Sequence, residues 1–73
     1  VLDNEPRNLQ IVRYNERLIE LGKNVCIWPS SIKEKDINDM AYNKSTRTIE
    51  KIINENTYSG LRATLKLNEW RKV

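Results

Sequence analysis

The sequence has no histidine and a single cysteine, Cys26. Without histidine, the chain cannot form a Cys/His zinc site, a Ser-His-Asp triad or any site that uses imidazole as acid or base. One cysteine cannot form a disulfide within the chain, and its apolar neighbours predict a buried thiol in a reducing compartment, with no nucleophilic role. Any metal bound by this chain is therefore expected to be a hard cation held by oxygen.

Long hydrophobic runs are also missing. No segment approaches the roughly 20 apolar residues that span a bilayer, and no signal peptide is visible, so we expect no membrane contact and a cytoplasmic location. The 73 residues, 38% hydrophobic and 32% charged, predict one small domain, residues 1–73, with a marginal core. Residues 37–73 hold seven basic and four acidic side chains, whereas residues 1–36 hold six of each. This mild basic excess is compatible with a polyanionic partner.

The apolar pattern of the first half predicts an α/β fold. Val1-Leu2 has the pattern of the end of one strand, and Val25-Cys26-Ile27-Trp28 that of a buried strand. Residues 4–22 have the period of an amphipathic helix that ends at Gly22, with Pro6 in its first turn. A strand, helix, strand unit implies two short parallel strands joined by a right-handed crossover, flanked by helices.

The second half predicts further helices. One is expected from Asp36 to Tyr42, and another from Thr46 to about Asn56, capped by Ser45. Residues 61–69 have the alternation of a third strand but the residue types of a helix. We expect an extended start that passes into a terminal helix.

Four carboxylates are the candidates for chemistry: Asp3, Glu5, Asp36 and Asp39. Because ligands gather beyond the carboxyl ends of parallel strands, these side chains are expected to converge on one sheet edge. Such a cluster would suit Mg²⁺ or Mn²⁺ and the transfer of phosphoryl or nucleotidyl groups. The alternative is structural, because Asp3 or Asn4, and Asp36, are also typical helix N-caps. Spacing alone favours capping.

The order of the motifs resembles a known family. The motifs are Asp3-Asn4-Glu5-Pro6-Arg7-Asn8, Trp28-Pro29, Lys35-Asp36-Ile37-Asn38-Asp39 and Asn56-Thr57-Tyr58-Ser59-Gly60-Leu61. Together they resemble the second half of a toprim domain, and more closely the C-terminal part of the DNA primase subunit of large tailed bacteriophages. The resemblance implies a toprim-like parallel sheet and Mg²⁺ or Mn²⁺ as cofactor. It assigns catalytic metal binding to Asp3, Glu5 and Asp36, with Asp39 as a further metal ligand.

The sequence departs from the family at two points. Glu5 stands where the family has an aspartate, and the family's glutamate on an earlier strand is absent from this chain. The resemblance therefore implies a fragment, inactive alone, of an enzyme that joins ribonucleotides into RNA primers on a DNA template. It implies the remainder of the primase and a replicative helicase as partners, and the host cytoplasm as the location.

Three basic residues flank the acidic motifs: Arg7, Lys33 and Lys35. They are candidates for contacts with nucleotide phosphates or the DNA backbone, and the alternative is a solvated rim that pairs with neighbouring acids. Trp28 is expected in the core, whereas Trp70 is the candidate for an exposed contact with nucleic acid or another subunit.

A second functional class stays open on the sequence. The chain also fits a non-enzymatic α/β module that binds nucleic acid or a protein partner through its basic C-terminal half. Two parallel strands leave open edges and cannot cover both faces of a sheet. We therefore expect the isolated chain either to associate, for example with a second copy, or to stay loosely folded.

Overall fold

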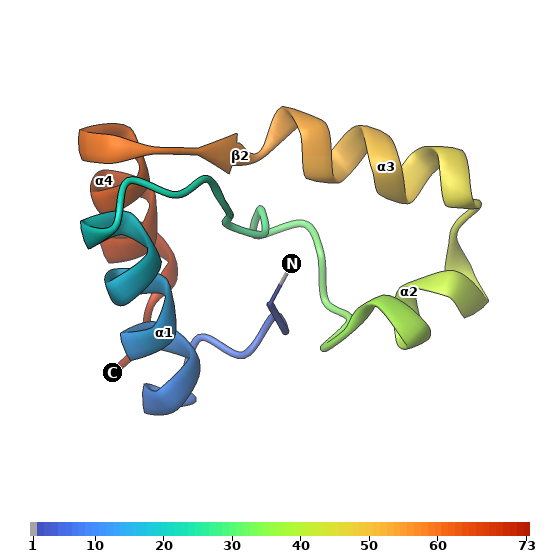
Figure 1. The fold of residues 1–73 in the computed structure, drawn as a ribbon. Helices are drawn as coiled ribbons and strands as arrows, with labels where there is room; N and C mark the ends of the chain where they lie inside the picture. The colour runs from blue at the N-terminus through green and yellow to red at the C-terminus, as the bar shows by residue number, and fades with distance from the viewer. Residues whose placement is uncertain (1) are drawn as a thin grey trace.

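A computed structural model describes residues 2–73 and contains, within that range, four helices and two very short strands. In chain order these are α1 (Leu9–Glu20), β1 (Val25–Cys26), α2 (Ile37–Asn43), α3 (Thr46–Glu55), β2 (Thr57–Tyr58) and α4 (Gly60–Trp70). Helices α1 and α4 lie side by side at one end of the molecule, and α2 and α3 form a second pair at the other end (Figure 1). The domain is therefore mostly helical.

The two strands pair in antiparallel fashion, with Val25 opposite Tyr58 and Cys26 opposite Thr57. The predicted parallel sheet is wrong. Leu2 is not in a strand, and its carbonyl instead accepts a hydrogen bond from the indole of Trp28 at 2.9 Å. Val1, the other half of the predicted first strand, lies outside the described residues. The continuous apolar run from Val25 to Trp28 indicated burial on both faces, which does not specify the direction of the partner strand.

Both faces of that run are covered by helices. Val25 and Ile27 pack in a cluster with Ala63 and Leu67 of α4. Cys26 and Trp28 belong to a second cluster, with Ile32, Met40 of α2 and Ile49 of α3. Successive side chains of an extended segment point to opposite faces, so one short run holds the two helical pairs together. Trp28 is 3% exposed, which confirms its predicted place in the core.

Helix α1 begins later than the sequence pattern predicts. Its N-cap is Asn8, whose side-chain oxygen accepts hydrogen bonds from the amides of Gln10 and Ile11. The predicted capping by Asp3 or Asn4 is therefore wrong, and Pro6 lies in a turn before the helix. Just after the helix, Gly22 has a φ of 76°, a left-handed conformation that glycine adopts without steric cost, and this confirms the predicted end.

The predictions for α2 and α3 are confirmed, whereas the prediction for α4 is wrong in part. Helices α2 and α3 start after the expected caps, Asp36 and Ser45. The predicted extended start at residue 61 is wrong, because α4 is helical from Gly60 onward. Ala63 and Leu67, four residues apart, form its buried stripe, while Leu61 and Leu65 are 74% and 54% exposed. The apolar residues that alternate along this segment therefore do not share one buried face, because Leu61 and Leu65 are exposed whereas Ala63 and Leu67 are buried.

Candidate functional site

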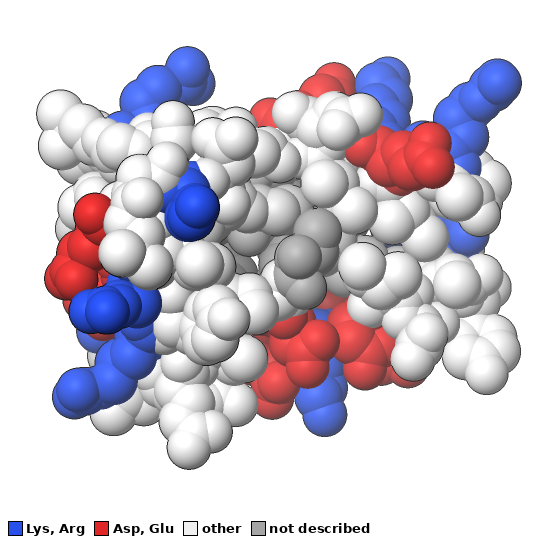
Figure 2. Space-filling view, in the orientation of Figure 1, with Lys and Arg blue, Asp and Glu red and all other residues white. Residues whose placement is uncertain are grey.

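The segments that carry the two acidic motifs are adjacent in space. The backbone amide of Asn4 donates a hydrogen bond to the carbonyl of Lys35 at 2.6 Å. Asp3 and Glu5 flank Asn4 in the chain, and Asp36 follows Lys35. Figure 2 shows acidic side chains gathered near the middle of the lower edge, between the N-terminal segment and α2. We call this region, residues 3–5 and 35–39, the acidic edge.

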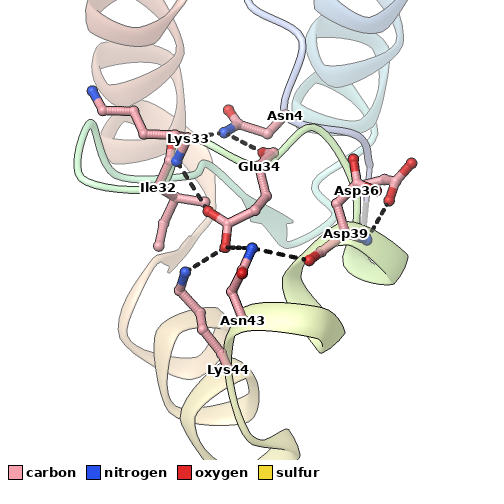
Figure 3. A network of polar contacts seen from close by, with 8 residues as sticks. All are labelled: Asn4, Ile32, Lys33, Glu34, Asp36, Asp39, Asn43 and Lys44. Carbon is pink, nitrogen blue, oxygen red and sulfur yellow. Dashed lines mark hydrogen bonds and ion pairs between the residues drawn. The ribbon is translucent and has the colours of Figure 1, made fainter.

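Asn4 joins the segments of the acidic edge through hydrogen bonds. Its side-chain amide donates to the carbonyls of Ile32 and Glu34, each at 3.0 Å (Figure 3). Its side-chain oxygen accepts from the indole of Trp70 at 3.0 Å. Asn4 thereby joins the N-terminal segment, residues 32–35 and the end of α4. In the sequence it stood between two candidate acids, and no local signal distinguished it from them.

The carboxylates of the acidic edge have different environments. Asp36 caps α2, because its Oδ1 accepts from the backbone amide of Asp39 at 2.8 Å, as the structural alternative predicted. Within residues 2–73, the side chains of Asp3 and Glu5 form no hydrogen bond or ion pair with one another or with other side chains, and both are half-buried. Over that same range, no three acidic or cysteine side chains are grouped closely enough to hold a metal ion together.

Glu34, which lies beside the acidic edge, was not among the candidate site residues. Its carboxylate pairs with the ammonium of Lys44, at the end of α2, and also accepts a hydrogen bond from the backbone amide of Lys33 (Figure 3). Its side chain is only 12% exposed. The bond from Lys44 lowers the pKa of Glu34 below its usual 4.5. The ion pair between Glu34 and Lys44 therefore connects residues 32–36 to the end of α2, and Lys44 neutralises the charge of Glu34.

The three predicted basic candidates are exposed and lie in different surroundings. Lys33 donates from its ammonium to the carbonyl of Ser30 at 3.0 Å. Arg7 borders a shallow hollow together with Glu5 and Lys72. Lys35 contributes its backbone carbonyl to the bond with Asn4. Their roles in contacting phosphates stay a prediction.

A groove of about 560 Å³ also borders Asn4. It is lined as well by Pro6, residues 27–30, Ile32, Lys33, Asn56, Tyr58, the C-terminal half of α4 and Lys72. Its aromatic lining comes from Trp28, Tyr58 and Trp70, and its charged lining from Lys33, Lys66, Lys72 and Glu69. We call it the lysine groove. It was not predicted as a unit, because its lining comes from segments far apart in the chain.

Contacts with neighbouring residues fix the positions of Trp70 and Lys66 in the lysine groove. Trp70 is partly buried against the core cluster of Val25 and Ile27, and its indole is bonded to Asn4. Lys66 lies over the ring of Tyr58, 5.6 Å from the ring centroid, and 3.7 Å from a carboxylate oxygen of Glu69. Trp70 was predicted to be exposed, but it is half-buried, and its ring forms part of the wall of the groove.

Cys26 is excluded as a nucleophile by its environment. The residue is 9% exposed, and burial raises the pKa of its thiol to about 11. The thiol is therefore protonated at neutral pH, and the nucleophilic form of cysteine is the thiolate. The structure confirms that the thiol is buried, as predicted.

Comparisons with known proteins give one informative result. No model of a known protein family matches the chain. The chain is 36% identical to a DNA primase of Enterobacteria phage T4 over 77 aligned residues, which cover all of this chain and 22% of that protein. The similarity agrees with the resemblance to phage primases that the motifs carry, and it does not bear on a toprim domain. Across residues 2–73, none of the helices combines the length and apolar character that crossing a bilayer requires.

Proposed function

We propose that this chain is part of a phage-type DNA primase and contributes the acidic edge to the site of nucleotidyl transfer. The observation that carries the proposal is the 36% identity to the phage T4 DNA primase over the whole chain. The backbone bond between Asn4 and Lys35 supports it, because it brings together the two segments that carry Asp3, Glu5 and Asp36. The chain matches only 22% of the length of the T4 primase, so we propose that the activity requires the rest of a larger protein.

Mg²⁺ in phosphoryl-transfer sites is commonly bound through one or two carboxylates, with waters and substrate phosphate oxygens completing the octahedron. Asp3, Glu5 and Asp36 are the proposed ligands, with Asp39 in support. No three acidic side chains of residues 2–73 are grouped closely enough to hold one ion together, so at most two of these carboxylates would bind it in this arrangement. The cap of α2 uses one oxygen of Asp36, and a carboxylate has a second oxygen with which to bind a cation.

The proposed ligands would place divalent charge beside an incoming triphosphate. Mg²⁺ or Mn²⁺ bound there would neutralise charge on the transferring phosphoryl group and lower the pKa of the attacking hydroxyl. Arg7, Lys33 and Lys35 are proposed to contact phosphates near the acidic edge. The partners that follow are a DNA template, ribonucleotides, the remainder of the primase and a replicative helicase, in the host cytoplasm.

Manganese titration followed by NMR tests the acidic edge. Paramagnetic Mn²⁺ should broaden the amide signals of residues 3–5 and 35–39 together and more strongly than those of the rest of the chain. The variants Asp3→Asn and Asp36→Asn should each weaken this broadening, and Asn is as good an N-cap as Asp, so the second should keep α2 intact. Glu50→Gln, an exposed acid on α3, is the matched control. The proposal fails if the two variants bind Mn²⁺ like the unsubstituted chain, or if the control weakens binding equally.

A further inference from the structure

The lysine groove has the chemistry of a site for an anionic, aromatic ligand. Three lysines and one glutamate line it, so its charged lining has a net charge of +2. Lys66 and Lys72 come from the C-terminal half of the chain, where the basic excess lies. The volume of about 560 Å³ is within the range of roughly 300–1,000 Å³ typical of small-ligand sites.

The basic lining continues beyond the groove. A second, shallow hollow shares Pro6 and Lys72 with the groove and extends the surface to Arg7, with Glu5 as its one carboxylate. A single nucleotide needs one pocket, whereas a polynucleotide chain needs a track that follows its backbone. The two adjoining hollows provide such a track, with cations at Lys66, Lys72 and Arg7.

We propose that the lysine groove binds single-stranded DNA, with Lys66 and Lys72 at the phosphates and the exposed part of the Trp70 ring against a base. Sites for single strands combine a basic groove with aromatic rings on which bases stack. Trp70 suits this role because the core and the bond to Asn4 fix its ring before a ligand arrives. The choice of DNA among polyanions rests on the proposed primase function, whereas the binding itself needs neither metal nor the acidic edge.

Fluorescence anisotropy with a labelled oligothymidylate of about ten nucleotides tests the lysines. The titrations are done in EDTA, so failure of the acidic edge cannot affect them. The double variant Lys66→Gln and Lys72→Gln should lower the salt slope of log K by about 1.4, which is ~0.7 per lost phosphate contact. At about 50 mM salt this corresponds to a loss of affinity of well over tenfold.

Two further variants separate a groove from general charge attraction. Lys23→Gln with Lys51→Gln removes the same charge from exposed lysines that border neither hollow, and it should leave most of the affinity. Glu69→Gln removes the one carboxylate of the groove and should tighten binding severalfold, because Lys66 loses its competing partner. The proposal is overturned if the two double variants lose equal affinity, or if the unsubstituted chain does not bind at about 50 mM salt.

Tryptophan emission tests the stacking contact. Trp28 also lines the groove but is only 3% exposed, so most of the quenching by DNA should come from Trp70. Trp70→Phe should remove most of the quenching and leave the salt slope unchanged. It should lose less affinity than Trp70→Leu, because phenylalanine still offers a ring, although it loses the bond to Asn4. Trp70→Leu should lose at least about fivefold in affinity.

Thymidine triphosphate should bind far more weakly than the oligonucleotide. Equal binding of the two, or full quenching in Trp70→Phe, contradicts a single-strand track at Trp70.

Discussion

Substitution of Asn4 should damage this fold more than its half-buried position suggests. Asn4→Ala removes three side-chain hydrogen bonds, to Ile32, Glu34 and Trp70, while the backbone bond to Lys35 is kept. At ~1 kcal/mol for each bond, the free energy of unfolding should fall by about 3 kcal/mol. A 73-residue domain has only about 4–11 kcal/mol of total stability, so the variant should be marginally folded.

Asn4→Asp makes the test sharper because it keeps the shape of the side chain. The new carboxylate can still accept from Trp70, but it cannot donate to the carbonyls of Ile32 and Glu34, and it places a negative charge beside them. Those carbonyls favour its protonated form, so the variant should regain stability as the pH falls through its raised folded-state pKa. Urea denaturation at pH 7 and at pH 5 measures both effects. Asn54→Asp, on the exposed face of α3, is the control and should change stability by at most about 1 kcal/mol, from the new charge near the C-terminus of α3 and beside Glu50. Equal stability of the two variants at pH 7 would refute the role of Asn4.

Two further predictions concern the pair α2 and α3. Because Lys44 lowers the folded-state pKa of Glu34, the stabilisation from this pair is fully present above pH 4.5 and is lost as the pH falls through the lower folded value. Glu34→Gln should flatten that part of a plot of urea midpoint against pH, and an unchanged profile would contradict the assignment. Met40→Ala should lower the free energy of unfolding by about 2–5 kcal/mol, because Met40 is fully buried, whereas Tyr42→Ala, at an 88% exposed position, should cost under about 0.5 kcal/mol. Equal losses in chemical denaturation would show that the core does not centre on Met40.

Local signals predicted α2, α3 and the end of α1 because the determinants of these features are close in sequence. Asp36 and Ser45 are caps whose bonds reach only three residues along the chain. Gly22 ends α1 through its own backbone conformation. The start of α1 was missed because three residues near it, Asp3, Asn4 and Asn8, all have side chains suited to capping, and the choice of Asn8 depends on Asn4 being used elsewhere.

Pairing between distant segments was the part that the sequence did not reveal. The partner of Val25-Cys26 is Thr57-Tyr58, a pair with one exposed and one half-buried residue and no apolar run to mark it as a strand. Conversely, Val1-Leu2 had the expected apolar character, but Leu2 lies outside the sheet. Burial pattern specifies how many faces of a strand are covered, whereas the direction of pairing depends on where the connecting helices place the chain.

Asn4 also links the acidic edge to the lysine groove. Its backbone amide is bonded to Lys35 at the acidic edge, and its side-chain oxygen is bonded to Trp70 at the wall of the groove. In the proposed primase, one residue would therefore set the position of the metal ligands relative to the strand held in the groove. A substitution that breaks only the side-chain bonds should loosen Trp70 while the backbone bond to Lys35 persists. Binding of DNA should then weaken more than binding of Mn²⁺ in Asn4→Ala, provided that both are measured below its unfolding transition.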